Sequence, residues 1–506
     1  INAQLQPGQH LCVNYHLDLP GLPNPAADSC TGNGGAHQHN SLSVLRRFQA
    51  VTLSGDIDEA QLPSVCALEQ ASIGGLGLNL ETDSQPLAAW HSALASDLEA
   101  GCAALPRTGQ DLEAGLSATA DLAGILDLLG RCQGAAPLLR SWAQDLMDAE
   151  ARRGNLPRVV PAVPGESILR EAGSTEALVL TVWSLYRHFG DLEMVDVAYS
   201  AVARLLRVMH ETAPDHIRWY SVPALESQLP ADLVGTGWFY RSAMLAAELA
   251  GVLGKTEDQT HFALLAEDIR SAFRRRFVTA EGAVVSRTQS ALCLALGGGL
   301  LDLQERPMAI ASLVASVRQE GLRVQTGQLP MLLQILSRNG HLSLALSLVS
   351  TESGCAQFTE NYGRSMVAAG ALEWIYGDLL GLRLPNDADL ASGAFRHLLI
   401  EPSLPLGTEY ADALGWTRIA GSCQTIRGEI RCGWRLVEDG LVLTVELPVD
   451  TTAQLQLPGR APELLSAGPH ERLLQRSELP DDGIPKLLDA RVDSPRRESL
   501  RYPRAS

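Results

Sequence analysis

The feature that most constrains the fold is a long middle segment in which apolar residues recur at helical spacing. The pattern runs from residue 86 to about residue 382 and contains hardly any period-two stretches. Glycine, proline and asparagine divide it into twelve predicted helices, at residues 86–104, 111–129, 135–153, 174–189, 191–212, 231–253, 256–277, 286–297, 305–319, 326–338, 340–350 and 361–380. Twelve consecutive helices make six helical hairpins.

Strand-like sequence flanks the helical segment on both sides. The first 80 residues are rich in proline, glycine and asparagine, and residues beyond 385 alternate or are β-rich between turns. We predict four regions, which are an N-terminal β-rich region (1–82), six hairpins (83–384), a C-terminal antiparallel β-sandwich (385–473) and a tail (474–506). This order is typical of a mainly α protein with an (α/α)6 toroid, whose inner helices surround a funnel. The fold alone gives no function.

Composition and charge exclude several classes of protein. The chain has 58 acidic and 40 basic residues and a formal charge of −18, which would repel nucleic acid or an anionic membrane. Its most apolar run, residues 290–301, falls short of the roughly 20 residues that span a bilayer, so we expect a soluble protein. The chain begins at Ile1 without a leader pattern, which leaves cytoplasmic and secreted locations open. The sequence is also compatible with a homo-oligomer.

The nine cysteines show no C-x-x-C or metal-finger spacing, so we expect no metal site and no cofactor. One pair stands out. If Arg427 and Gly428 form the two-residue turn of a hairpin, Cys423 and Cys432 lie opposite each other. A cross-strand disulfide can then form.

Six landmarks follow one another between residues 139 and 458. They are R-R-G-N-L-P (152–157), W-S-L-Y-R-H-F-G-D (183–191), G-T-G-W-F-Y (235–240), T-Q-S-A (288–291), Q-T-G with S-R-N-G-H (325–327, 337–341), and L-L-I-E-P with P-V-D-T-T-A (398–402, 448–453). In order and spacing they resemble the bacterial α-L-rhamnosidases, glycoside hydrolase family 78. The resemblance implies the toroid, a carbohydrate substrate, and hydrolysis of a rhamnose-containing glycan or glycoside.

The family's catalytic positions are altered. The rhamnosidases carry P-T-D-C-x-x-R-D-E-R-x-G-W-x-G-D, with its Glu as the general acid; the alignment places Ala114 at that Glu and Ala118 at the Trp, and only the final acid survives, as Asp121. The family's W-E-R-W loop and N-H-Y motif have no counterpart in residues 351–362. Its W-S-D-A segment becomes S-T-E-A, which keeps an acid at Glu176.

An inverting glycosidase needs a protonated and an ionised carboxyl group about 6.5–9.5 Å apart. We predict Glu113 as the acid and Glu360 as the base, with Asp121 and Glu176 holding sugar hydroxyls. In the alternative interpretation, Glu113 and Glu360 are only charges at helix N-termini, where the macrodipole favours them.

Further candidates for sugar contact are aromatic rings, on which pyranose C–H faces pack, and polar side chains predicted near the funnel. They are Trp238, Tyr240, Gln289, Gln328, Asn361, Tyr362 and Arg364, with Trp183, Trp219 and Tyr220 as additional stacking candidates. The two glutamines are either hydrogen-bonded core amides or sugar contacts. Asn361, Tyr362 and Arg364 lie where the final predicted helix begins, near Tyr362.

Three functions remain open. The first is a hydrolase with a relocated carboxylate pair. The second is a polysaccharide lyase acting on rhamnose–glucuronate linkages, for which Tyr362, Arg364, Asn361 and His188 could supply a base and a group that neutralises the uronate. The third is a degenerate paralogue that binds sugar or a partner protein without turnover.

Overall fold

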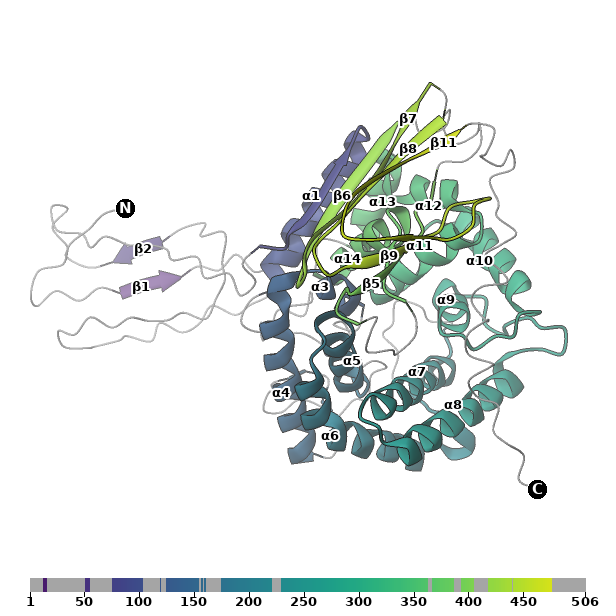
Figure 1. Ribbon diagram of the computed structural model, residues 1–506. Helices are drawn as coiled ribbons and strands as arrows, with labels where there is room; N and C mark the ends of the chain where they lie inside the picture. Colours follow the sequence, from purple (N-terminus) through teal and green to yellow (C-terminus); the bar gives the residue numbers. More distant parts are fainter. Residues whose placement is uncertain are drawn as a thin grey trace, which may run out of the picture.

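Helices make up most of the structure and form two concentric layers (Figure 1). The computed structural model describes the backbone of residues 12–15 and 51–54, and residues 75–102, 119, 124–153, 156–157, 159–160, 174–220, 229–362, 366–385, 393–404, 417–438 and 440–475. The inner layer contains α3 (Leu126–Gly130), α5 (Ala177–Phe189), α7 (Ala231–Val252), α9 (Gln289–Gly297), α11 (Leu329–Arg338) and α15 (Leu372–Trp374). Each contacts the next, and α15 contacts α3, so the inner ring is closed.

The outer layer pairs with the inner one as six hairpins. It contains α1 (Gln85–Gly101), α4 (Ala136–Arg153), α6 (Leu192–Glu211), α8 (Thr256–Phe277), α10 (Arg306–Glu320) and α12 (Leu342–Val349). Helix α4 packs on α5, α6 on α7, α8 on α7, and α10 on α9. The predicted (α/α)6 toroid is therefore confirmed.

Local chemistry explains why these segments are helical, as α5 and α6 show. Helix α5 ends at Gly190, which adopts the left-handed conformation (φ +69°) that glycine tolerates best. The Asp191 carboxylate then accepts a hydrogen bond of 3.0 Å from the Met194 backbone N–H and caps α6. Within α6, residues such as Val195 and Val202 recur at helical spacing on the buried face.

Near the final inner helix the sequence prediction is wrong in detail. The interval after α12 forms another helix, α13 (Glu352–Tyr362), so Tyr362 ends a helix where the sequence suggested that one begins. The predicted helix at 361–380 is divided into α14 (Met366–Ala369), α15 and a π-helical turn, η5 (Ile375–Leu379). Gly370 lies at the first break.

Three glycines bring parts of the ring into backbone contact. A Cβ atom on Gly124 would lie 2.7 Å from the Cα atom of Gly327, and one on Gly370 would lie 2.7 Å from the carbonyl oxygen of Gly124. No side chain separates these three segments. The break at Gly370 therefore coincides with a close approach that only glycine allows.

The C-terminal domain contains two sheets, drawn in green and yellow in Figure 1. The five-stranded sheet is antiparallel, in the order β11 (Gly468–Gln475), β8 (Gly440–Leu447), β7 (Gly428–Val437), β6 (Arg418–Thr425) and β3 (Leu78–Thr82). The four-stranded sheet has the order β10 (Glu463–Leu465), β9 (Thr452–Leu455), β5 (His397–Ile400) and β4 (Leu382–Arg383). Its β5–β9 pair is parallel, which the antiparallel prediction missed. Strands β1 (Cys12–Tyr15) and β2 (Val51–Ser54) pair separately.

Strand β3 joins the segment that precedes α1 to the C-terminal sheet. Leu78 pairs with Cys423, and the Asp83 carboxylate accepts hydrogen bonds from the backbone and side chain of Thr417. One continuous hydrophobic core extends through the helices and both sheets. The predicted tail lies outside the described residues beyond Gln475.

The hairpin that carries two cysteines has a different register from the one predicted. Thr425 pairs with Gly428, so the turn consists of Ile426 and Arg427 and is shifted by one residue. The shift moves the partner of Cys423 from Cys432 to Ile430, and both thiols are free. The cross-strand disulfide is therefore absent.

No helix within the described ranges is both long enough and apolar enough to span a bilayer. Among the same residues, no group of three or more histidine, cysteine and acidic side chains could hold a metal ion.

A buried histidine between α1 and η5 makes stability depend on pH. His91 Nε2 and the Tyr376 hydroxyl share a hydrogen bond of 2.7 Å, and burial lowers the pKa of His91 to about 4 from 6.5. Above pH 6.5 the imidazole is neutral in both states. Between pH 6.5 and 4 only the unfolded chain takes up the proton, so the free energy of unfolding falls as pH falls, by up to about 3 kcal/mol.

His91→Gln is expected to remove this contribution. Thermal unfolding midpoints of the wild type and the variant, measured at pH 7 and pH 4.5, should differ in their pH dependence, with the wild type losing more on acidification. Parallel pH curves would contradict the assignment.

Candidate functional site

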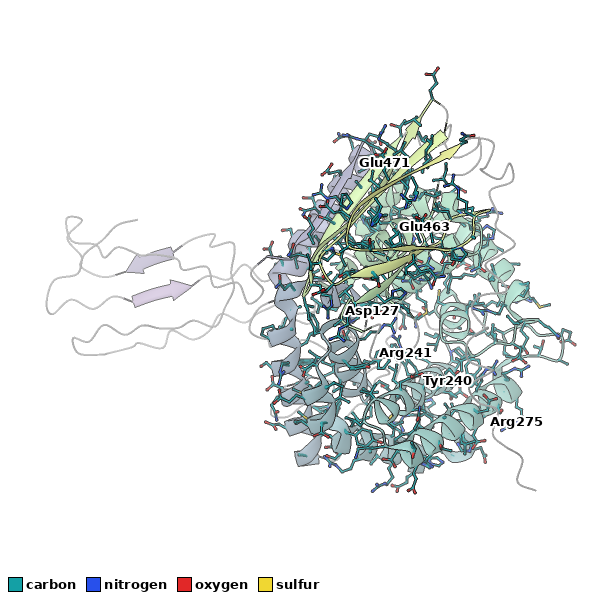
Figure 2. All side chains as sticks on the ribbon, viewed as in Figure 1. Asp127, Tyr240, Arg241, Arg275, Glu463 and Glu471 are labelled. Carbon is teal, nitrogen blue, oxygen red and sulfur yellow. The ribbon has the colours of Figure 1, made fainter. Side chains whose placement is uncertain are left out.

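Two opposite charges face the interior of the helical ring. Asp127 comes from α3 and Arg241 from α7, and Figure 2 shows both, with Tyr240, toward the middle of the ring, while Arg275 lies on its outer rim. Asp127 is 62% exposed although protein surrounds it closely enough to desolvate its carboxyl group. The carboxylate therefore reaches solvent although protein atoms lie around it.

The surroundings favour an ionised Asp127. Burial alone would raise the pKa of this carboxyl group, but the positive charges of His188 in its protonated form, Arg241 and Arg187 outweigh it and hold the pKa below its ordinary value. Burial lowers the pKa of Arg241, and Asp127 opposes that shift. At neutral pH the site thus presents one negative and one positive group.

His188 lies behind Asp127. Its Nε2 atom is 3.9 Å from the Asp127 carboxylate, and its Nδ1 atom is 3.1 Å from the Ser184 carbonyl oxygen. The same Nδ1 atom lies 3.2 Å from the Ser184 hydroxyl oxygen. Burial lowers the pKa of His188 to about 4, and the imidazole is neutral at physiological pH. A Cβ atom on Gly130 would overlap the imidazole, so this glycine makes room for it.

The aromatic part of the site comes from the G-T-G-W-F-Y segment, which lies in α7. Trp238 and Tyr240 are both half-buried, and the guanidinium carbon of Arg241 is 5.5 Å from the centre of the Trp238 ring. Residues three apart share a helix face, so Trp238 and Arg241 belong to one surface. Trp238 therefore lies beside the charged pair.

Glu176 anchors a buried network just before α5. Its carboxylate accepts a hydrogen bond from the Tyr220 hydroxyl, which in turn accepts one of 2.6 Å from Arg218 Nε. The Arg218 backbone N–H donates to the Thr236 hydroxyl at 3.1 Å. Burial, with the adjacent Glu176 charge, raises the pKa of Tyr220. Glu176 is fully buried, so its network fixes the loop that precedes α7.

Trp219 lies between Arg218 and Tyr220 in the chain, and its side chain points to the solvent-exposed side. Arg218 and Tyr220 are buried, whereas Trp219 is 66% exposed. Alternation along an extended segment explains the difference, because successive side chains point to opposite sides. A large ring on an anchored backbone is a suitable stacking platform for a sugar.

The two glutamines have different environments. Gln289 donates to the Gly321 carbonyl at 2.8 Å and accepts from the Arg323 backbone N–H at 2.9 Å, as expected of a hydrogen-bonded core amide. Gln328 is buried, and its Oε1 atom has no hydrogen-bond partner among the described residues. An unpartnered amide oxygen keeps the predicted sugar contact of Gln328 open.

Glu360, Asn361 and Tyr362 lie at the C-terminal end of α13. The Asn361 amide donates to the Leu322 carbonyl and the Tyr362 hydroxyl to the Val324 carbonyl, each at 2.9 Å, while Glu360 is exposed. The alternative interpretation of Glu360 as a charge at a helix N-terminus is therefore wrong. A carboxylate near a helix C-terminus is weakly disfavoured by the macrodipole.

Three predicted site residues, Glu113, Asp121 and Arg364, lie outside the described residues. The roles predicted for all site residues stay predictions.

Sequence reasoning missed Asp127, Arg241 and Arg218. Arg241 could have been found, because it follows Trp238 at a spacing that shares a helix face. Asp127 gives a weaker signal, since it is a single acid within the apolar run I-L-D-L-L at residues 125–129.

Two family models match the chain in the order of its domains. Residues 130–358 match the bacterial alpha-L-rhamnosidase 6 hairpin glycosidase domain, and residues 381–470 match the bacterial alpha-L-rhamnosidase C-terminal domain. Together they cover the helices from α4 to α12 and most of the C-terminal sheets.

Similar proteins include bacterial alpha-L-rhamnosidases. An alpha-L-rhamnosidase of Streptomyces avermitilis is 26% identical over 474 residues, covering 87% of this chain and 44% of that protein. One of Formosa agariphila is 25% identical over 361 residues, covering 63% and 37%. The chain thus spans less than half the length of these relatives.

Solved structures share the fold. The Streptomyces avermitilis alpha-L-rhamnosidase complexed with L-rhamnose has a TM-score of 0.68 at 24% identity, over 78% of this chain and 42% of that one. Native rhamnosidase from Aspergillus terreus has a TM-score of 0.68 at 18% identity, over 84% and 55%.

Proposed function

The chain resembles the bacterial α-L-rhamnosidase family in both its helical and its C-terminal domain, and from this premise we propose that it is a rhamnosidase-like glycoside hydrolase. Its proposed substrate is a rhamnose-containing glycan or glycoside. The observation that carries the proposal is the match of both domains, in order, to rhamnosidase models. The exposed Trp219 and the half-buried Trp238 support it, because both suit contact with a sugar ring.

The proposed catalytic pair is Glu113 as acid and Glu360 as base. The acid would protonate the leaving glycosidic oxygen, and the base would take a proton from the water that attacks the anomeric carbon. The exposure of Glu360, at the end of a helix whose dipole disfavours it, supports a role beyond stability. Asp121 and Glu176 would hold sugar hydroxyls directly or through the groups they orient.

Hydrolysis of 4-nitrophenyl α-L-rhamnopyranoside by the full chain tests the activity, with nitrophenol release and the anomeric configuration of rhamnose as readouts. Glu113→Gln and Glu360→Gln are expected to lower the rate by about 10²–10⁴-fold. Glu352→Gln is the matched control, because Glu352 is an exposed acid at the opposite end of α13. It should leave the rate unchanged.

Other outcomes overturn parts of the proposal. Full activity in Glu360→Gln would discard the base. No nitrophenol release, with an ultraviolet band of unsaturated uronate from rhamnose–glucuronate oligosaccharides, would replace the hydrolase by a lyase. Sugar binding without either product would leave a non-catalytic sugar-binding protein.

A further inference from the structure

We propose that Asp127, Arg241 and Trp238 form a second carbohydrate subsite, on the inner side of the ring, that binds a neutral pyranose. This subsite deepens the proposed function and rests on it for the choice of sugar. None of the three residues belongs to the predicted acid–base pair. Each contributes a different kind of contact.

Asp127 supplies a hydrogen-bond acceptor. Its carboxylate is 62% exposed, and its one ion-pair contact within the described ranges is the His188 imidazole at 3.9 Å, beyond hydrogen-bond length. Lone pairs that face solvent can accept bonds from sugar hydroxyls. A carboxylate is a stronger acceptor for such bonds than a neutral group.

Arg241 supplies the donors. Two other arginines hold carboxylates, because Arg131 pairs with Glu373 and Arg338 with Asp378. The Arg241 guanidinium forms no ion pair with any described residue, and its observed contact is the face of Trp238. Its N–H groups are thus available to an incoming oxygen atom.

The charge balance selects a neutral ligand. An anion attracted by Arg241 would meet the repulsion of Asp127, and a cation attracted by Asp127 would meet that of Arg241. A sugar carries hydroxyls that both donate and accept, so it can satisfy the two groups together. The half-buried Trp238 ring offers an apolar surface to the C–H face or methyl group of a deoxy sugar.

The subsite lies at a different level along α5 from the Glu176 network. The Ser184 hydroxyl donates to the Leu126 carbonyl at 3.2 Å, which places Asp127 level with the C-terminal half of α5, whereas Glu176 precedes that helix. Eight residues of helix separate Glu176 from Ser184, or about 12 Å along the axis. The two positions are distinct along the funnel.

Calorimetric titration of the full chain with L-rhamnose tests the subsite. Asp127→Asn and Arg241→Met are expected to weaken rhamnose binding at this subsite at least ten-fold. Asp268→Asn and Arg275→Met are the matched controls, because both residues are exposed on the outer helix α8, and they should bind as the wild type does. Circular dichroism and thermal midpoints check folding, and Arg241→Lys, which keeps the charge but loses the planar fork, should bind with intermediate affinity.

Two results would overturn the subsite. One is unchanged rhamnose affinity in both Asp127→Asn and Arg241→Met. The other is tighter binding of sodium D-glucuronate than of L-rhamnose, lost in Arg241→Met, which would show that the position selects anions. Failure of the proposed function is distinguishable, because the wild type would then bind rhamnose in an Asp127-dependent way without hydrolysing the aryl rhamnoside.

Discussion

Glu373→Gln is expected to lower the free energy of unfolding by about 3–5 kcal/mol. The Glu373 carboxylate accepts two hydrogen bonds from Arg131, at 2.6 Å from Nε and 2.5 Å from the terminal nitrogen, and both side chains are buried. Burial raises the pKa of Glu373 even though Arg131 opposes the shift, so the surroundings tolerate the charge only through its partner. The variant leaves a buried guanidinium without a counter-charge. The midpoint of urea unfolding, followed by circular dichroism, measures the loss.

Two comparisons separate the ion pair from general disruption. Arg431→Met breaks the exposed pair with Glu429, 3.4 Å apart, and should cost less than about 1 kcal/mol. The double change Arg131→Met with Glu373→Leu removes both charges and should be more stable than Glu373→Gln alone. A double variant no more stable than the single one would contradict this account.

Gly124→Ala is expected to destabilise the ring by about 1–3 kcal/mol or more, because its new methyl group would collide with backbone that cannot rotate away. The nearest atoms would be the Cα, O and C atoms of Gly327, at 2.7, 2.8 and 3.1 Å. The reciprocal change is the control. A Cβ on Gly327 would have Gly124 Cα as its nearest neighbour at 3.9 Å, so Gly327→Ala should be close to neutral.

Thermal unfolding midpoints of the two alanine variants measure this asymmetry. Equal losses would show that the contact is not the one described. Activity on the aryl rhamnoside should follow stability in both variants, since neither glycine presents a side chain to a substrate.

Hydrophobic period predicted the helices well because each of them buries one face. The period places a helix at residues 256–277, where α8 lies, and at 231–253, where α7 ends one residue earlier. It failed where tertiary contact overrides local preference. Gly370 breaks a helix because it packs against Gly124, and no local pattern shows that approach.

Turn chemistry was less reliable than helical period. Turn chemistry favours Arg427–Gly428, because glycine tolerates positive φ, yet the chain turns at Ile426–Arg427, and this shift of one residue changed the partner of Cys423. The parallel β5–β9 pair was missed for a related reason, since strand composition does not give direction.

Site residues could be predicted where a segment of the chain resembles a motif of the family. The landmarks led to Trp238 and Glu176, but the structure was needed to show that Tyr220 binds the latter. Asp127 and Arg241 are far apart in the chain and meet only when the ring closes. A single sequence does not show which charged residues become neighbours in the folded protein.

Strand β3 has a consequence for synthesis on the ribosome. Asn79, on that strand, donates a hydrogen bond of 3.3 Å to Ser422, which is 343 residues further along the chain. At typical elongation rates, β3 waits on the order of tens of seconds before its partner emerges. During that time the nascent chain carries an unpaired strand with exposed backbone groups, so chaperone protection of this segment would favour correct assembly.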